Sequence, residues 1–300
     1  MMRVVVLALV ASVAHCLPNL VDDLAAHGNT SQLADLITKA GLEATLKGPG
    51  PFTILAPLNS AFDAIPKDDL NALLADTNDL ANTLKYHVLQ GEIFSWDIQS
   101  GRIVHSLTGH AIRMYKQGND IYFNNAKAVA VDLETDNGVI YLLDTVLDVP
   151  EGTIYGILEN PDYKLSKFRS AVDKVRYDRL LNTTYSYGNY RYTLFAPSDD
   201  AFAKLDQSQL DRFFQNPTYL SDLVRYHLHR GTIHLKSLDR NGRVTSLYTG
   251  HDIGVDISNN DIRLNHVAHL TESDIEADNG VVHILDHVLI PSTLTGQIVG

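Results

Sequence analysis

The chain has 300 residues, a hydrophobic content of 45% and a formal net charge of −12. This composition is typical of a globular protein with one large domain or two ordinary ones. An acidic surface without Lys/Arg clusters argues against nucleic acid or an anionic membrane as the main partner, and it favours cationic or metal-bridged partners.

Residues 1–16 predict a secretory signal peptide. A basic residue precedes the apolar run from Val4 to Ala14, which suits a signal-peptide core and is too short to span a bilayer. We expect cleavage before Leu17. The alternative, a lipidated Cys16, is disfavoured by the bulky His15 in front of it. Cleavage removes the only cysteine, so we expect the stability of the mature chain to come from packed cores rather than disulfides.

Other features of the sequence also indicate export. The sequons at Asn29 and Asn182 are typical of secreted proteins, and we expect glycan on at least one of them. No later apolar run reaches transmembrane length, and the C-terminal residues lack the hydrophobic end of a glycolipid-anchor signal. We therefore expect an extracellular protein without a transmembrane segment or lipid anchor.

The remaining sequence contains one pattern twice. FTILAPLNSAF at 52–62 returns as YTLFAPSDDAF at 192–202, and the Tyr86-His87 pair returns as Tyr226-His227. A later Asp-Asn-Gly-Val stretch, at 136–139 and 278–281, follows the same order. A period this long indicates whole domains rather than solenoid units. We predict domains at 17–150 and 151–292, followed by a C-terminal tail at 293–300.

Each copy is expected to begin with helices and then form a strand-to-helix corner. Apolar residues recur at helical spacing after Ser31, a candidate N-cap. In the corner, Pro57 or Pro197 should end the strand. Asn59 or Asp199 is expected to cap the following helix, which places Phe62 or Phe202 inward.

The pattern in the second half of each copy predicts a helix followed by a sheet. His87 and His227 share an apolar helical stripe with leucines, which favours buried, hydrogen-bonded histidines near a helix end over ligands or catalytic groups. Short alternating segments follow. Each copy closes with an apolar strand, VIYLLDTVL or VVHILDHVL, which we expect to be central in its sheet because both of its faces are apolar.

These motifs together resemble the fasciclin-domain family over about residues 19–292. The resemblance implies an α+β fold of two tandem domains, each a roughly seven-stranded β-wedge or barrel with helices packed on its N-terminal half. It also implies a role in cell adhesion or the extracellular matrix, without enzymatic activity. The expected partners are extracellular proteins such as integrin-like receptors or matrix proteins.

The resemblance also suggests candidate contact residues. Glu272, Asp274 and Ile275 lie where family members carry an integrin-contacting Glu-Pro-Asp-Ile-Met motif. The Tyr-His segments at Tyr86, His87, Tyr226 and His227 correspond to segments reported as adhesive in the family, although their apolar setting predicts burial. The tripeptide Leu147-Asp148-Val149 matches a known integrin-binding motif.

Motifs of catalysis are absent from the sequence, and we expect no catalytic residues, metal or cofactor. Eight of the thirteen histidines lie between His227 and His287; we interpret them as structural rather than as a metal or pH site. The alternative function is a soluble extracellular carrier of an apolar molecule such as a carotenoid. The tyrosines at Tyr185, Tyr187, Tyr190 and Tyr192 would line its site.

Overall fold

The computed structural model describes residues 17–184, 191–238, 242–258 and 261–295. The expected signal peptide lies outside these residues. By its internal contacts the chain divides into two compact units: unit 1 comprises residues 1–98 and 128–144, and unit 2 comprises 99–127 and 145–300. No helix in the described part of the chain is long and apolar enough to span a membrane.

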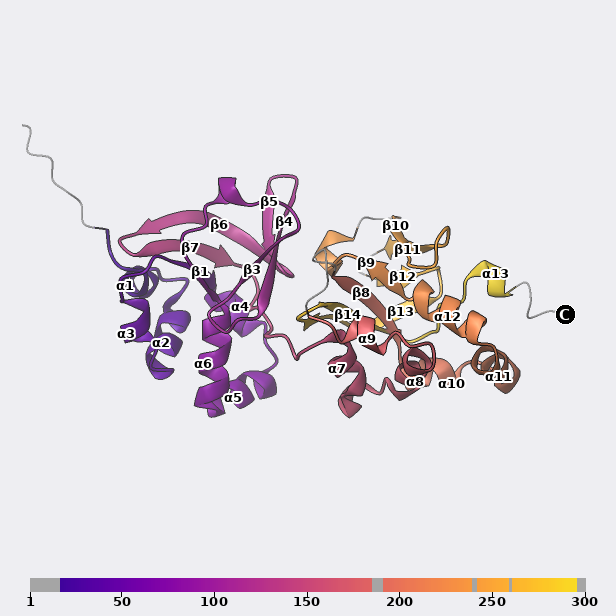
Figure 1. Ribbon diagram of the computed structural model, residues 1–300. Helices are drawn as coiled ribbons and strands as arrows, with labels where there is room; N and C mark the ends of the chain where they lie inside the picture. The colour runs from indigo at the N-terminus through magenta and orange to yellow at the C-terminus, as the bar shows by residue number, and fades with distance from the viewer. Residues whose placement is uncertain (1–16, 185–190, 239–241, 259–260, 296–300) are drawn as a thin grey trace, which may run out of the picture. The chain divides into compact units, whose positions relative to one another are not determined.

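The first copy of the pattern forms helices followed by a seven-stranded sheet of order β2-β1-β7-β6-β5-β4-β3 (Figure 1). The helices are α1 Leu20–Ala26, α2 Ser31–Lys39, α3 Glu43–Leu46, α4 Asn59–Asp63, α5 Lys67–Ala75 and α6 Thr77–Tyr86. The strands are β1 Phe52–Pro57, β2 Val88–Gln90, β3 Arg102–His105, β4 Ala111–Gln117, β5 Asp120–Phe123, β6 Ala126–Thr135 and β7 Gly138–Leu143, with the 3₁₀ turn η1 at Ser95–Asp97.

The second copy repeats this arrangement in a sheet of order β10-β11-β12-β13-β14-β8-β9. Its helices are α7 Ile154–Glu159, α8 Ser166–Lys174, α9 Asp178–Leu181, α10 Asp199–Ala203, α11 Gln207–Gln215, α12 Pro217–Tyr226 and α13 Ser292–Thr295, with 3₁₀ turns η2 Pro161–Tyr163 and η3 Leu235–Ser237. Its strands are β8 Tyr192–Pro197, β9 Leu228–Arg230, β10 Arg243–Thr245, β11 Asp252–Ser258, β12 Asp261–Leu264, β13 Ala268–Ala277 and β14 Gly280–Leu285. Each sheet is barrel-like, which confirms the predicted fold class.

The closing strands are central, as predicted. β7 lies between β1 and β6, and β14 lies between β8 and β13. The pairing of each closing strand with its corner strand is parallel, for example Val282 opposite Leu194. Every residue of β7 and β14 is buried, as expected of strands covered on both faces.

The Asn-Gly pair before each closing strand joins the helices to the sheet. Asn279 is buried; its Oδ1 accepts a hydrogen bond from the Ile154 amide at 2.8 Å, and its Nδ2 donates to the Leu181 carbonyl at 2.7 Å. Gly280 follows, and a Cβ there would collide with the backbone carbonyl of Tyr192. A small residue is therefore required where β14 begins beside β8.

The two corners form as predicted, but their capping differs. β1 and β8 end at the prolines, and Phe62 and Phe202 are 3% and 2% exposed. Asn59 and Asp199, however, are the first residues of their helices rather than caps.

The side chains of these two residues instead cap an earlier helix. Asn59 Oδ1 accepts from the Gln32 amide at 3.1 Å, at the start of α2, and Asp199 Oδ1 accepts from the Lys167 amide at 2.7 Å, at the start of α8. The N-cap of α2 is Thr30 rather than Ser31, and its side chain makes no cap hydrogen bond. The expected local caps were wrong because an acceptor distant in sequence satisfies these amides.

Two apolar clusters stabilise the second copy. One packs helices against the sheet and includes Phe168, Phe202 and Val282; the other includes Phe195, Ile253 and Leu264 from the strands. Together they bury the side chains that the sequence predicts to be apolar and inward-facing.

Candidate functional site

The segment around Asp274 is shaped by an irregularity in β13. The pairing of β13 with β14 shifts register between Leu270 and Ile275, and Asp274 has a positive φ of 58°. Aspartate is one of the few residues that tolerate this conformation. The Asp274 side chain is 14% exposed, and its Oδ1 accepts a hydrogen bond from the Leu235 amide at 2.9 Å. Its carboxylate therefore caps η3.

The first copy has the same feature at Asp132 in β6. Asp132 has a φ of 57° and lies within an equivalent register shift, between Ala130 and Leu133. Its carboxylate accepts from the Ser95 amide at 2.7 Å and from the Ser95 hydroxyl at 2.5 Å, at the start of η1. Both copies thus use an aspartate in a bulge to hold a 3₁₀ turn against the sheet.

The side chains at positions 141 and 283 complete this support in two different ways. In the first copy the Tyr141 hydroxyl lies 2.9 Å from the Ile93 carbonyl and 3.2 Å from Asp132 Oδ1. In the second copy His283 Nε2 lies 2.8 Å from the Ile233 carbonyl, and His283 Nδ1 accepts from the Asp274 amide at 3.2 Å. Burial lowers the pKa of His283, so the ring is neutral and donates through Nε2.

Of the predicted contact residues in this segment, Glu272 is the exposed one. Ile275 is half-buried and packs on the core of the second copy. Burial and the nearby Glu151 raise the pKa of Glu272. The segment therefore presents a carboxylate at 272, while the Asp274 carboxylate faces inward to η3.

The two Tyr-His pairs lie inside the protein. Tyr86, His87, Tyr226 and His227 are between 0% and 4% exposed. Each histidine ends its helix, with Nδ1 2.8 Å from the carbonyl four residues earlier, and burial lowers the pKa of both histidines to about 4. Neither pair is accessible to a partner in this conformation, which agrees with the expected burial.

The structure also shows where the other predicted site residues lie. Asn29 and Asn182 are exposed, and Asn182 Oδ1 accepts from the Thr153 hydroxyl at 2.8 Å. In the tripeptide 147–149, only Asp148 is exposed. No group of three or more metal-ligating side chains occurs among the described residues. The tyrosines at 185–190 lie outside them, and Tyr192 is buried in β8.

Sequence reasoning missed a buried charged cluster in unit 2. Arg113 and Glu276 are each 3% exposed and lie 2.6 Å apart, and His234 Nε2 contacts the other Glu276 oxygen at 2.6 Å. Burial opposes ionisation of Glu276, but the neighbouring His234 and Arg113 outweigh it and lower its pKa. These three residues are far apart in the sequence and belong to no motif, so no sequence pattern predicted that their side chains would pair.

A pocket of about 360 Å³ adjoins the cluster in unit 2. Its lining includes Arg113, Arg191 and Arg230. Arg113 already donates to Glu276 and to the carbonyls of Ala277 and Gly280. We therefore assign the cluster a structural role.

Sequence reasoning also missed an aromatic pair at η1, in which Trp96 is exposed and Phe94, just before the turn, is half-buried. Trp96 is 67% exposed, and its ring stacks on Phe94 with centroids 4.5 Å apart. The chain contains a single tryptophan, and the composition alone could have marked this residue as a candidate contact residue.

Comparison with known proteins places these features in a family. The fasciclin domain model matches residues 28–150 and 163–291. The transforming growth factor-beta-induced protein ig-h3 of Oryctolagus cuniculus is 30% identical over 270 residues, which cover 90% of this chain and 37% of that protein. Periostin of Homo sapiens is 30% identical over 256 residues, which cover 84% of this chain and 30% of that protein.

The chain thus spans about a third of the length of these two relatives. Among solved structures, a FAS1 domain pair from the insect cell adhesion molecule fasciclin I aligns with a TM-score of 0.42 and 20% identity, over 90% of this chain and 95% of that one. Because the family model matches most of the sequence, in two successive copies, the chain belongs to the fasciclin-domain family.

Proposed function

We propose that this protein acts outside the cell as a matrix or adhesion protein that binds partner proteins through its fasciclin domains. The observation that carries the proposal is the tandem match to the fasciclin family, with similarity to ig-h3 and periostin over most of this chain. The proposal includes no catalytic step. Its partners are integrin-like receptors or matrix proteins.

We propose the segment from Glu272 to Ile275 as one contact site. Glu272 offers an exposed carboxylate, and Asp274 fixes the neighbouring backbone by capping η3. A carboxylate on a rigid segment suits integrin recognition, because it can complete the coordination shell of a receptor-bound metal ion. Asp274 would then position the segment, and Glu272 would make the contact.

Cell attachment to the immobilised full chain tests this site. We expect Glu272→Gln to reduce divalent-cation-dependent attachment while leaving the unfolding midpoint unchanged. Glu159→Gln is the matched control, because Glu159 is an exposed glutamate at the end of α7. Equal attachment to both variants and to the unchanged protein would discard the segment. Failure of the unchanged protein to support attachment to any integrin-bearing cell would count against integrins as the receptor class.

Export is tested separately in a eukaryotic host. The secreted chain should begin near Leu17, and glycosidase treatment should increase its mobility through loss of glycan at Asn29 or Asn182. Intact Met1 on the secreted protein would contradict the signal peptide. Unchanged mobility would contradict both glycosylation sites.

A further inference from the structure

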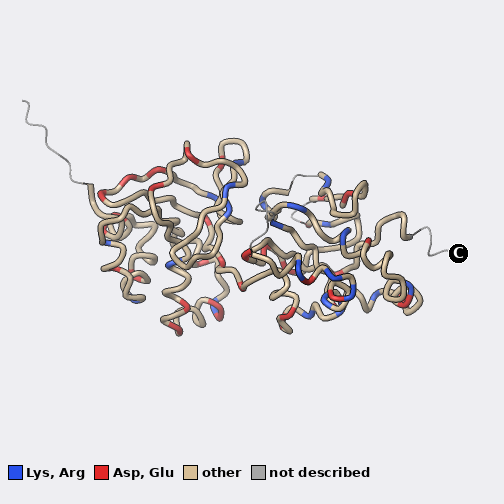
Figure 2. The backbone as a smooth tube through the Cα atoms, in the orientation of Figure 1, with Lys and Arg blue, Asp and Glu red and all other residues tan. Residues whose placement is uncertain are grey.

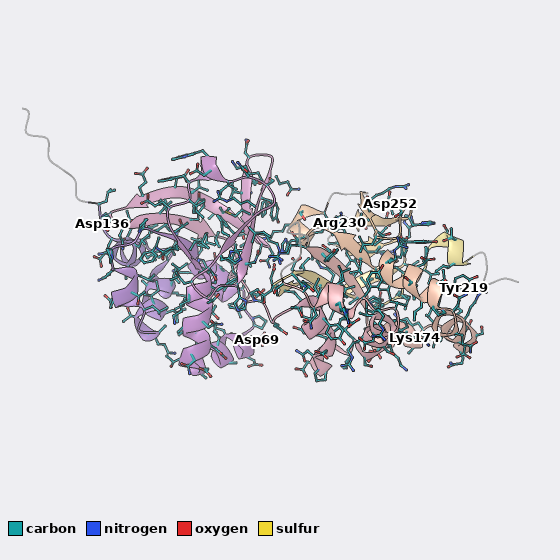
Figure 3. The ribbon with its side chains drawn as sticks, in the orientation of Figure 1. Asp69, Asp136, Lys174, Tyr219, Arg230 and Asp252 are labelled. Atoms are coloured by element: carbon teal, nitrogen blue, oxygen red, sulfur yellow. The ribbon has the colours of Figure 1, made fainter. Side chains whose placement is uncertain are left out.

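The charge of the protein is distributed unevenly between its two units. Residues 17–98 and 128–144, which form unit 1 after the expected signal peptide, contain four Lys, no Arg and fifteen Asp or Glu, a net charge of −11. Residues 99–127 and 145–300 contain nineteen Lys or Arg against twenty-one Asp or Glu, a net charge of −2. Figure 2 shows the resulting scarcity of blue in unit 1. Asp69 and Asp136, labelled in Figure 3, are two of its exposed carboxylates. Unit 1 therefore attracts cationic partners.

Unit 1 also carries the Phe94–Trp96 stack. The two rings are nearly parallel, with an interplanar angle of 5°. Large aromatic side chains bury most of their surface in folded proteins, and exposed ones are enriched where proteins bind partners. Here the Trp96 ring is supported from one side by Phe94.

The support beneath the stack is rigid. Asp132 holds the Ser95 amide and hydroxyl, and the Asp97 amide donates to the Phe94 carbonyl at 2.9 Å. On the preceding residue, the Ile93 amide donates to the Thr53 hydroxyl at 2.9 Å. Binding on such a turn loses little conformational entropy, because the backbone is already ordered.

The second copy shows that the fold does not require these rings. At an offset of 140 residues, His234 stands in place of Phe94, and Lys236 stands in place of Trp96. The 3₁₀ turn still forms, and Asp274 caps it as Asp132 caps η1. An exposed position that accepts lysine in one copy does not need tryptophan for folding in the other.

We propose that the Phe94–Trp96 stack is a docking site for a basic segment of a partner protein. An Arg or Lys side chain of the partner stacks on the Trp96 ring, because a ring face attracts cations. Exposed carboxylates flank the rings at Glu92 and Asp97, and the net charge of unit 1 steers the basic segment toward them. This site is distinct from the Glu272 segment, so it does not depend on the proposed function.

The single tryptophan provides a direct probe. We would titrate the full mature chain with a synthetic peptide of alternating Arg and Gly and record Trp96 emission and binding heat. Peptides with Glu in place of Arg, and a neutral oligosaccharide, are the comparison ligands. We expect a saturable change with the Arg peptide, weakened by salt, and none with the comparison ligands.

Variants test whether the ring makes the contact. Trp96→Leu and Trp96→Lys should each weaken binding of the Arg peptide by about tenfold or more, measured by binding heat. Both should keep the unfolding midpoint, because the second copy folds with lysine at this position. Asn71→Lys is the matched control for charge, since Asn71 is an exposed residue of α5 in the same unit, and it should weaken binding by less than about twofold.

Three results would overturn the proposal. The first is equal binding of the Arg peptide by the unchanged chain and by Trp96→Leu, which would show that the net negative charge of the protein, and not the ring, binds the peptide. The second is a change of Trp96 emission with the oligosaccharide but not with the Arg peptide, which would assign the stack to carbohydrate. The third is that the unchanged protein forms a dimer and the Trp96→Leu variant does not, which would assign the stack to contact with a second copy of this chain.

Discussion

Acid should destabilise this protein through His227, because the hydrogen bonds of that side chain require a neutral ring. His227 Nδ1 donates to the Leu223 carbonyl at 2.8 Å, and Nε2 accepts from the Leu289 amide at 3.0 Å. A proton on Nε2 would remove the acceptor that pairs the buried Leu289 amide. Burial accordingly lowers the pKa of His227 from 6.5 to about 4.

The direction of the pH dependence follows from these two pKa values. Below pH 6.5 the unfolded chain takes up a proton at this histidine, while the folded chain does not do so until about pH 4. The stability that the neutral ring contributes is therefore present above pH 6.5 and is lost as the pH falls toward 4. Between pH 7 and pH 5 the free energy of unfolding should fall by about 2 kcal/mol from His227 alone.

The substitution His227→Phe isolates this contribution. It keeps a ring beside Phe168, whose centroid lies 5.3 Å from that of His227, but it leaves the Leu289 amide unpaired. At pH 7 we expect a loss of about 1–3 kcal/mol. At pH 5 the variant and the unchanged protein should differ by about 2 kcal/mol less than at pH 7, since phenylalanine does not titrate.

The assay is urea unfolding of the full chain at several pH values, followed by circular dichroism. Because two domains can unfold in separate steps, the comparison uses the transition that the substitution shifts. His266→Asn is the control: the His266 side chain is 83% exposed, and asparagine tolerates its φ of 63°. A difference between His227→Phe and the unchanged protein that stays constant from pH 7 to pH 5 would refute the neutral, buried ring.

Three further substitutions test other parts of the structure by the same unfolding measurement. Gly280→Ala should cost about 3 kcal/mol or more, because its Cβ would meet the Tyr192 carbonyl; an unchanged midpoint would contradict the close approach of β8 and β14. Arg113→Met should cost about 3–5 kcal/mol, because it leaves the carboxylate of Glu276 without its guanidinium partner; a small loss would show that this pair is not buried in solution. Asp132→Ala should cost about 1–3 kcal/mol through loss of the cap on η1, and no loss would mean that the turn does not depend on it.

The sequence predicted those parts of the fold that depend on local pattern. The apolar run of β14 and the proline that ends β8 could be interpreted from the sequence, because burial and the missing amide act at the residue itself. The same holds for His227, whose helical spacing from leucines placed it inside the protein. Duplication strengthened each interpretation, since a pattern that occurs twice in order is difficult to obtain by chance.

Contacts between distant residues could not be predicted in this way. Asn59 and Asp199 look like local caps, yet each accepts a hydrogen bond from an amide of an earlier helix, 27 and 32 residues before it in the sequence. Nothing in the sequence distinguishes the two uses, because the same carboxylate or amide oxygen serves either. The contact of Asp274 was equally unpredictable from the sequence. Its carboxylate oxygen faces η3 because the residue lies in a bulge of β13.

The two copies separate what the fold needs from what it only permits. At positions 132 and 274 both copies keep aspartate, and at 141 and 283 they exchange tyrosine for histidine while contacting the carbonyl of the same turn residue, Ile93 or Ile233. Such positions are constrained by buried hydrogen bonds. At Trp96 that constraint is absent, because the second copy has an exposed lysine there. A side chain as large as tryptophan on an ordered, exposed turn therefore needs a reason outside the fold, and a partner that covers it is the physical reason that its chemistry supports.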